Sequence, residues 1–467
     1  MKELRRNMRV VGAIILILFI TAGVWYGATV YTQGNVWASN VYNTRLVRTS
    51  SDRGDITDRT GMTLATTDAN GVRRYLDNEH ARRALSQTVG DVNGMSAGVE
   101  SFYSATLMDI STSLSDRLSE VFSDARHVGS SVQLTIDAKL QAYIASIFPQ
   151  GYNGAVCVTN YKTGEILAMV SMPNYDPMNT SGGEEGVIDT AYLNRCLQGM
   201  YTPGSIFKII TLASALDYDP YVMHQAFTCS GTWEYEGGDI VCMSGRTQHG
   251  DINLKSAFTR SCNVTFGKLA YQLGIDRMRE TAETFGFNEN FKFGDFVIYN
   301  SSFPTSVSNM NELVWSGIGQ GEVLVTPLHM AMISGAVANK GNMMQPYLVK
   351  NITTALGQNE KTGTPTVYRR VMYEETAYTI AEYMYETVKS GTASKAAIRG
   401  LTVCGKTGSA ETSNDKLKET NAWYTGFIYD EKHPYAISVV IEEGGAGGNM
   451  AAELASAALQ KAVEFVG

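Results

Sequence analysis

The chain has 467 residues, a formal net charge of −8 and a sequence pI of about 5.4. Its length exceeds that of one ordinary domain, and a composition of 44% apolar and 18% charged residues excludes a disordered protein. The acidic balance argues against nucleic acid as a partner, because nucleic-acid-binding proteins favour a basic face, and six cysteines in a chain this long exclude a disulfide framework.

The first predicted element is an uncharged apolar run from Val10 to Tyr31. About twenty such residues cross the hydrocarbon core of a bilayer, which is roughly 30 Å thick. The alternative is a cleaved signal peptide, whose apolar region would be shorter, roughly 7–15 residues. Basic residues before the run predict a cytoplasmic start with the remainder of the chain outside. These are Lys2, Arg5, Arg6 and Arg9. We therefore expect residues 1–31 to hold a cytoplasmic start and an uncleaved transmembrane anchor.

Two regions follow the anchor. Residues 32–148 are polar with broken periodicity, and they predict a mixed α+β unit of modest core. Residues 149–467 carry more regular patterns. Within them, Gly154–Tyr161 and Glu165–Ser171 are predicted strands, joined by a hairpin turn at residues 162–164.

The remaining elements predict the fold class. Ser205–Leu216 is apolar nearly all round, which is typical of a buried helix. Three successive strands and an amphipathic helix are predicted near the end of the chain. These are Leu401–Gly405, Ala422–Tyr429, Pro434–Glu442 and the helix Ala451–Val466. Two strands, a helical middle, three strands and a final helix predict an α/β (α+β) body with an antiparallel sheet flanked by helices.

The start of the buried helix carries a candidate nucleophile. A serine needs a base within hydrogen-bond reach, and lysine can be that base when burial suppresses its charge. Residues i and i+3 share a helix face, so S-x-x-K places a hydroxyl beside an amine. Ser205 and Lys208 form such a pair, and the helix start also offers N–H groups to an oxyanion. A second S-x-x-K, at residues 413–416, lies in a polar stretch between two strands, and we favour the first pair.

K-T-G occurs three times. The copy that begins at Lys162 lies in the predicted hairpin turn. The copy that begins at Lys361 is expected in a polar loop, where a nearby proline disfavours a central strand. The third copy follows an apolar run and is expected on a sheet edge beside a cleft. There Lys406 would bring positive charge, Thr407 a hydroxyl, and Gly408 room for a substrate to approach the backbone.

S-x-N occurs once, at Ser261-Cys262-Asn263. Taken alone, this motif is also explained as a helix cap, since Ser and Asn cap helices readily. In the order S-x-x-K, S-x-N and K-T-G, however, the three motifs form the known signature of penicillin-binding proteins.

On these motifs the sequence resembles the class B penicillin-binding proteins, which are monofunctional transpeptidases. Other stretches are similar to blocks of that family, in the family's order. They are Arg53–Arg59, Leu134–Asp137 with Leu140 and Gln141, Gly164–Met169, Tyr201–Ser205, Gly319–Gly321 with Thr326–Leu328, and Trp423–Phe427. The resemblance covers nearly the whole chain. It implies a penicillin-binding, serine β-lactamase-like transpeptidase domain at 149–467 on an N-terminal pedestal at 32–148.

The resemblance also implies roles for the residues of the motifs. Ser205 would be acylated by the D-Ala-D-Ala end of a peptidoglycan stem peptide, or by a β-lactam. Lys208 would take its proton, and Ser261 and Asn263 would continue the hydrogen-bond network.

The substrate side of the site would be formed by Lys406, Thr407, Gly408 and Ser409. The first two would bind the substrate carboxylate, and the N–H groups of Ser205 and Ser409 would form an oxyanion hole. Ser409 is a departure, because many relatives have threonine after K-T-G, but it keeps a hydroxyl.

The implied enzyme is a serine-type D,D-transpeptidase of the bacterial cytoplasmic membrane. It is a single-pass protein with a cytoplasmic start, contacts lipid through its N-terminal helix, needs no cofactor for chemistry and has a polytopic glycan polymerase as its partner. One alternative is a D,D-carboxypeptidase or β-lactamase on the same fold, with water as the acceptor. Another is a non-enzymatic scaffold of wall synthesis. The anchor and the long N-terminal region favour the transpeptidase, because a secreted lactamase needs neither.

Four further residues suit a metal. Cys229, Cys242, His249 and Cys262 offer three sulfurs and one imidazole, a set suited to tetrahedral structural zinc, and some relatives resemble this arrangement and carry zinc. A Cys229–Cys242 disulfide, or unlinked buried thiols, are the alternatives. As the middle residue of S-x-N, Cys262 is expected to point away from the cleft.

Overall fold

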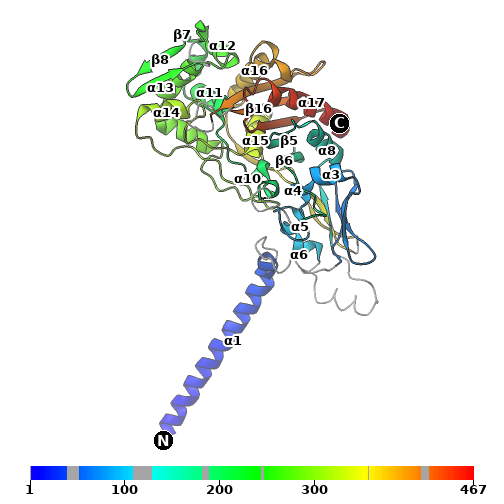
Figure 1. The fold of residues 1–467 in the computed structure, drawn as a ribbon. Helices are drawn as coiled ribbons and strands as arrows, with labels where there is room; N and C mark the ends of the chain where they lie inside the picture. Colours follow the sequence, from blue (N-terminus) through cyan, green and yellow to red (C-terminus); the bar gives the residue numbers. More distant parts are fainter. Residues whose placement is uncertain are drawn as a thin grey trace.

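The computed structural model describes residues 2–38, 52–108, 129–180, 189–242, 247–355, 357–411 and 420–467. Figure 1 shows the first of these as one long helix, α1 (Lys2–Ala38). Its window Arg6–Thr29 has 24 residues, a mean hydropathy of 2.2 and no buried residue. At 1.5 Å per residue this window is about 36 Å long, enough for a bilayer core. Helix α1 is therefore a candidate membrane anchor, at the position predicted for one.

The core of the C-terminal part is a five-stranded antiparallel sheet in the order β15-β16-β17-β5-β6. Its strands are β5 (Gly154–Asn160), β6 (Ile166–Met172), β15 (Val403–Ala410), β16 (Asn421–Ile428) and β17 (Tyr435–Ile441). The predicted strands and the hairpin at 162–164 are confirmed. Because β17 pairs with β5, segments almost 300 residues apart in sequence close one sheet.

Helices cover both faces of this sheet, which explains why its strands are buried along almost their whole length (Figure 1). Successive strand residues point to opposite faces, so Val156 packs with α8 (Ala138–Ile147) and α17 (Met450–Val466). Its neighbour Cys157 belongs to the other core, with the helical middle of the chain. The predicted C-terminal helix is thus confirmed as α17.

The helical middle contains the predicted buried helix as α11 (Lys208–Tyr218), preceded by a 3-10 turn, η1 (Gly204–Phe207), that holds the candidate nucleophile. Around it lie helices that were not individually predicted. These are α9 (Asp189–Tyr192), α10 (Arg195–Gln198), α12 (Leu254–Thr259), α13 (Asn263–Thr284), α14 (Met310–Ser316), α15 (Pro327–Ala338) and α16 (Glu374–Ser390). Helix α13 is kinked at Gly274, whose φ of 76° is left-handed.

Short strands interrupt this helical middle. They pair as β7 (Ala226–Cys229) with β10 (Gly250–Asn253), β8 (Thr232–Tyr235) with β9 (Gly238–Val241), and β11 (Asn342–Met344) with β14 (Val367–Arg370). Exposure alternates along β7 and β8 but not along their partners β10 and β9. Such short runs carry little periodicity, which explains why the sequence did not predict them.

A second, six-stranded sheet has the order β13-β12-β4-β1-β2-β3. Its N-terminal members are β1 (Ile56–Thr57), β2 (Thr63–Thr67), β3 (Arg73–Tyr75) and β4 (Ser131–Leu134), with short helices α3 (Glu79–Ala84), α4 (Ser86–Val89), α5 (Val99–Phe102) and α6 (Ser104–Leu107) nearby. The other two strands are β12 (Val349–Thr353) and β13 (Asn359–Thr362), so the sheet includes segments from both sides of residue 148. The division into regions 32–148 and 149–467 stays a prediction.

The expected loop at Lys361 is wrong, because this residue lies in β13, the edge strand of that sheet. An edge strand pairs on one side only, and all four residues of β13 are exposed, so their polarity does not oppose strand formation. Pro365 follows the end of the strand and removes no ladder hydrogen bond from it.

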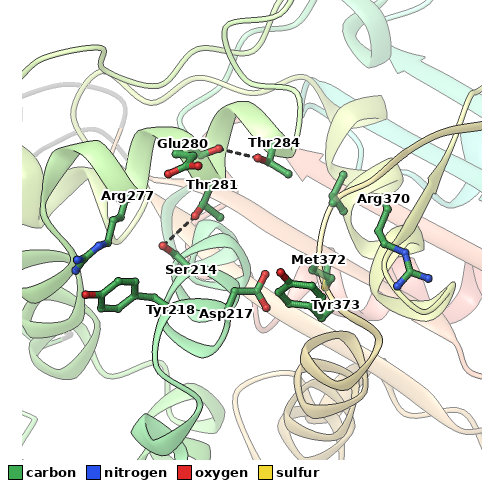
Figure 2. A pocket seen from close by; sticks show the side chains of 11 residues that line it. Ser214, Asp217, Tyr218, Arg277, Glu280, Thr281, Thr284, Arg370, Met372 and Tyr373 are labelled. Atoms are coloured by element: carbon green, nitrogen blue, oxygen red, sulfur yellow. Dashed lines mark hydrogen bonds between the residues drawn. The ribbon is translucent and has the colours of Figure 1, made fainter.

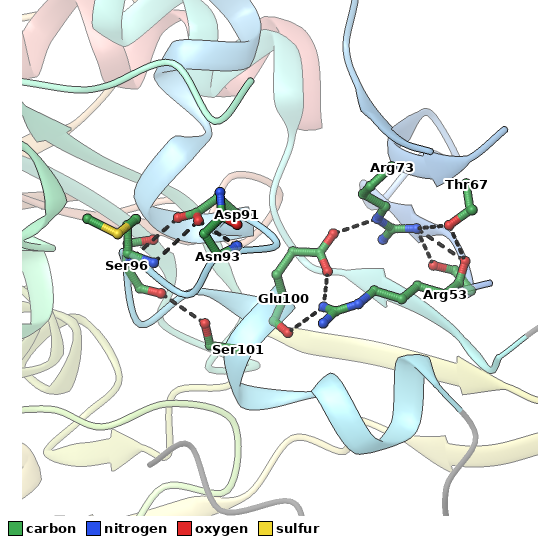
Figure 3. Close-up of polar contacts among 10 residues, drawn as sticks. Arg53, Thr67, Arg73, Asp91, Asn93, Ser96, Glu100 and Ser101 are labelled. Atoms are coloured by element: carbon green, nitrogen blue, oxygen red, sulfur yellow. Dashed lines mark hydrogen bonds and ion pairs between the residues drawn. The ribbon is translucent and has the colours of Figure 1, made fainter. Parts of the chain in front are cut away.

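A buried group of charges joins the first strands to the short helices (Figure 3). The Glu100 carboxylate is completely buried between two guanidinium groups, 2.7 Å from Arg53 Nη1 and 2.6 Å from Arg73 Nε. Arg73 Nη1 also donates to the carbonyl oxygen of Gly54. A Cβ at Gly54 would lie 2.2 Å from the oxygen of Ser130, so only glycine fits there. The stretch Arg53–Arg59, which resembles the family's opening motif, is therefore packed against the short helices beside the six-stranded sheet.

Candidate active site

The candidate nucleophile lies in the 3-10 turn that precedes α11. Ser205 is half-buried, and Lys208 begins the helix one turn later. The turn packs closely on β15, since a Cβ at Gly204 would lie 2.6 Å from the carbonyl oxygen of Ser409. The φ of Gly204 is +57°, which also favours glycine. The predicted helix start is confirmed, with the hydroxyl residue held against the strand that carries the third K-T-G.

Lys208 is completely buried and is held by the S-x-N motif. Its Nζ donates to Asn263 Oδ1 at 2.7 Å, to the Ser261 carbonyl oxygen at 2.8 Å and to Ser261 Oγ at 3.2 Å. Among the described residues, no hydrogen bond joins Lys208 Nζ to Ser205 Oγ. Burial lowers the pKa of Lys208 to about 8, although the nearby thiols of Cys262 and Cys242 act in the opposite direction. A neutral amine is therefore accessible near physiological pH.

The hydroxyl of Ser261 lies between two lysines. It accepts from Lys208 and, at 3.0 Å, from Lys406 Nζ, which is also completely buried. Burial and the charge of Lys208 hold the pKa of Lys406 well below its ordinary value. A serine hydroxyl has two acceptor positions and one proton to donate, so two lysine contacts leave that proton available.

The helix-cap explanation of S-x-N applies to its middle residue. Cys262 is the N-cap of α13, and its Sγ accepts from the Thr265 N–H, while Asn263 is the first helical residue. Asn263 Nδ2 donates to the carbonyl oxygen of Val241 at 2.9 Å, which orients its Oδ1 toward Lys208. Cys262 is fully buried, and its Sγ contacts Cys242 and Thr265, whereas Ser261 and Asn263 contact Lys208.

The third K-T-G lies in β15, the edge strand of the five-stranded sheet, as predicted. Lys406 Nζ donates to the Thr407 carbonyl oxygen at 3.0 Å as well as to Ser261. A Cβ at Gly408 would lie 2.8 Å from the Pro203 carbonyl oxygen, so glycine permits the close approach of the nucleophile turn. Ser409 Oγ accepts from the N–H of Gly447 at 3.3 Å.

Three contributors to this site were missed by the sequence analysis. Thr392, just after α16, shares a hydrogen bond of 2.7 Å with the Thr407 hydroxyl. The rings of Phe266 and Phe258 lie with their centroids 5.6 Å from Lys208 Nζ and 5.7 Å from Lys406 Nζ. No local motif marks these residues, because their contacts join segments that are distant in sequence.

The other two K-T-G copies form ion pairs outside the candidate active site. Lys162 forms an ion pair with Glu431 at 3.4 Å. Lys361, in strand β13 of the six-stranded sheet, forms one with Asp295 at 2.7 Å. The second S-x-x-K, at residues 413–416, lies outside the described residues.

The four predicted metal ligands are brought together beside S-x-N. Their ligand atoms all lie within 4.8 Å of one another. Cys229 Sγ is 3.6 Å from Cys242 Sγ and 3.4 Å from His249 Nδ1, and Cys242 Sγ is 3.6 Å from Cys262 Sγ. The three cysteines are free thiols, and the 3.6 Å between their sulfur atoms far exceeds the roughly 2.05 Å of a disulfide bond. The disulfide alternative is therefore not adopted. Hydrogen bonds from Cys242 and Thr265 lower the pKa of the Cys262 thiol.

Comparison with known proteins agrees with this geometry. The family model of the penicillin binding protein transpeptidase domain matches residues 154–460. The chain is 29% identical over 446 residues to the peptidoglycan D,D-transpeptidase PbpA of Mycolicibacterium smegmatis, covering 89% of each chain. It is 30% identical over 381 residues to PbpA of Mycobacterium tuberculosis, covering 74% of this chain and 75% of that one. The structure of penicillin-binding protein A from M. tuberculosis as a ceftriaxone acyl-enzyme superimposes with a TM-score of 0.81 at 27% identity, covering 90% of this chain and all of that one. The chain therefore belongs to the penicillin-binding protein transpeptidase family, as a class B penicillin-binding protein.

Proposed function

We propose that this chain is a serine-type peptidoglycan D,D-transpeptidase in which Ser205 is the nucleophile. The observation that carries this proposal is the pair of buried lysines that share the Ser261 hydroxyl beside the nucleophile turn. Support comes from relatives named peptidoglycan D,D-transpeptidase and from a relative captured as a β-lactam acyl-enzyme.

In the first half-reaction, neutral Lys208 takes the proton of Ser205 as Oγ attacks the carbonyl carbon of the penultimate D-alanine. The new Oγ–C bond forms, the C–N bond to the terminal D-alanine breaks, and that amine leaves with a proton passed through Lys208 and Ser261. Catalytic hydrogen bonds often tighten only when substrate is bound, so the Ser205–Lys208 hydrogen bond that this proton transfer needs would form in the substrate complex.

In the second half-reaction, the amine of a neighbouring stem peptide attacks the acyl-enzyme. An amide bond forms, the Oγ–C bond breaks, and Ser205 recovers its proton from the same network. A β-lactam follows only the first half, since its leaving amine stays attached to the acyl group.

The substrate carboxylate would bind at Lys406 and Thr407, on the edge strand β15. The N–H groups of Ser205 and Ser409 would stabilise the oxyanion, a contribution of roughly 3 kcal/mol per donor in other serine enzymes. The closeness of η1 to β15 supports this assignment, because a Cβ at Gly204 would lie only 2.6 Å from the carbonyl oxygen of Ser409.

Mass spectrometry with peptide mapping after treatment with a labelled penicillin tests the nucleophile. We expect one adduct on Ser205, and none in Ser205→Ala. An adduct on another serine would contradict the assignment. The lifetime of that adduct separates the alternatives, because release within seconds indicates a carboxypeptidase or lactamase. If Ser205→Ala fully supports wall cross-linking in the host, the scaffold alternative is correct.

We further propose that the cysteine and histidine cluster holds a structural zinc ion. Zinc–sulfur bonds of about 2.3 Å in a tetrahedron put sulfur atoms roughly 3.8 Å apart, close to the two 3.6 Å separations here. Bound zinc would hold Cys262 and thereby the flanking Ser261 and Asn263. Native mass spectrometry should detect one zinc ion per chain. Cys229→Ser should lose it, whereas Cys196→Ala, at a buried thiol outside the cluster, should keep it.

We also propose that α1 anchors the protein in the bacterial cytoplasmic membrane with its catalytic part outside. The apolar window of α1 and the basic residues before it support this orientation. Region 32–148 would act as the pedestal that docks a polytopic glycan polymerase. Digestion of intact protoplasts by an added protease tests the orientation, because only an outward-facing body is cleaved.

A further inference from the structure

A cavity of about 450 Å³ lies behind helix α11, at the end opposite Lys208 (Figure 2). Its lining comes from three elements: the last turns of α11, the C-terminal half of α13, and the segment that joins β14 to α16. This volume is in the usual range for sites that bind small ligands. The cavity is separate from the residues of the candidate active site, none of which lines it.

Charged groups of both signs line this cavity without pairing. Within the described part of the chain, Asp217, Arg277, Glu280 and Arg370 form no ion pair with any residue. The Arg277 guanidinium instead stacks on the ring of Tyr218, 3.3 Å from its centroid. In Figure 2, Arg277 and Arg370 lie at opposite ends of the lining with Asp217 between them.

Asp217 is half-buried at the floor of the cavity, and its carboxylate accepts a hydrogen bond from the Thr376 hydroxyl. Burial raises the pKa of this carboxyl. A carboxylate that is partly desolvated and has only a neutral partner is stabilised by an incoming cation. The guanidinium groups of Arg277, which is half-buried, and Arg370, which is exposed, offer positive charge to carboxylates of a ligand.

The walls of the cavity are held in place before any ligand arrives. Thr281 of α13 donates to the Ser214 hydroxyl of α11 at 3.0 Å, and the hydrogen bond of Thr376 to Asp217 joins α16 to α11. At the rim, Tyr218 and Tyr373 are 57% and 64% exposed. Their rings offer flat apolar surface next to the charges, a combination suited to a peptide with short side chains.

We propose that this cavity is a second peptide-binding site, for a short peptide that carries at least two carboxylates and at least one free amine. The carboxylates would pair with Arg277 and Arg370, and the amine with Asp217. An uncross-linked stem peptide with a diamino acid has this chemistry, and that choice of ligand rests on the proposed function. A bound peptide would contact the far ends of the elements that carry Lys208 and Asn263 at their starts.

The test is a calorimetric titration of the full-length protein, first acylated with benzylpenicillin so that the active site is occupied. The probe is the tripeptide L-Ala-γ-D-Glu-meso-diaminopimelate, which lacks D-Ala-D-Ala and cannot acylate a serine. We expect saturable binding of one peptide per chain. Arg370→Gln should weaken it at least about tenfold, the usual effect of losing one charge-assisted hydrogen-bond pair.

The matched control is Arg399→Gln, which removes the same charge from an exposed arginine outside the cavity. Absence of saturable binding, equal weakening by both substitutions, or undiminished binding of a fully amidated peptide would each overturn the proposal. Arg370 is exposed, and an unchanged melting temperature verifies that the variant is folded. If penicillin leaves no adduct on Ser205, the proposed function fails, and the effect of Arg370→Gln on the untreated protein still decides the inference.

Discussion

Two of the regions that bury charged side chains treat these charges in opposite ways. Beside the six-stranded sheet, Glu100 lies between Arg53 and Arg73, so each buried charge contacts a charge of opposite sign. In the candidate active site, Lys208 and Lys406 are buried on either side of one hydroxyl, and neither forms an ion pair within the described part of the chain.

The difference shows what burial does to an ionisable group. Where a counter-charge is present, the group stays charged and removal of the partner leaves an isolated buried charge. Where no counter-charge is present, burial shifts the pKa in the direction that favours the neutral form of the group. The lowered pKa of both lysines is an example. The first arrangement supports structure, and the second provides the amine that we propose as the base.

The largest expected effect is on catalysis at the unpaired lysines. Lys208→Met should slow acylation by penicillin about 10²–10⁴-fold, the usual contribution of a general base. The free energy of unfolding should change by less than about 2 kcal/mol, because lost hydrogen bonds are offset by removal of a buried charge. Stopped-flow acylation and chemical denaturation measure the two quantities. Lys162→Met, in the turn copy of K-T-G, should change neither, and a fast Lys208→Met enzyme would refute the base assignment.

At the paired charges, we expect a large effect on stability and none on catalysis. Glu100→Gln should lower the free energy of unfolding by about 3–5 kcal/mol, because the two buried guanidinium groups lose the carboxylate that both contact. The acylation rate of the remaining folded protein should be unchanged. Glu453→Gln is the matched control, since its pair with Lys395 is exposed and should contribute less than about 1 kcal/mol. Equal destabilisation by the two substitutions would remove the distinction between the regions.

The lowered pKa of Lys208 predicts how the rate depends on pH. Acylation should rise about tenfold between pH 7 and pH 9, because the neutral fraction of an amine with a pKa of about 8 rises through that window. Since the folded-state pKa lies below the ordinary 10.5, folding disfavours protonation, and this group's contribution to stability improves as pH rises from about 8 toward 10.5. A pH–rate profile that is flat across this window would show that Lys208 is not the titrating base.

The smallest expected effect concerns a residue outside the motifs. Thr392→Val removes the hydroxyl that hydrogen-bonds Thr407 and should slow acylation roughly fivefold, the effect of losing about 1 kcal/mol. Restoration of the rate by Thr392→Ser would verify that the hydroxyl is responsible. Thr379→Val, whose hydroxyl bonds only within α16, is the control and should leave the rate unchanged.

Much of the architecture was predictable because it depends on local pattern. The apolar run of α1, the strands β5, β6, β16 and β17, and the buried helix α11 each have a composition that few other structures accommodate. Sequence context also correctly predicted that the third K-T-G lies on a sheet edge, in β15. The copy at Lys361 was wrongly predicted to lie in a loop, because it lies in the exposed edge strand β13. An edge strand needs neither alternation nor apolar residues, so its pattern does not differ from that of a polar loop.

By itself, the sequence determined the order and chemistry of the motifs, and therefore the family and the identity of Ser205, Lys208, Ser261, Asn263 and Lys406 as candidates. Only the tertiary structure decided that Ser261 lies between two lysines, that Thr392 supports Thr407, and that Glu100 is buried between arginines. These contacts join residues from 15 to 145 positions apart. A local pattern indicates which side chains are buried, but which of them meet depends on how distant segments cross. That crossing is what lowers the pKa of Lys208 and of Lys406.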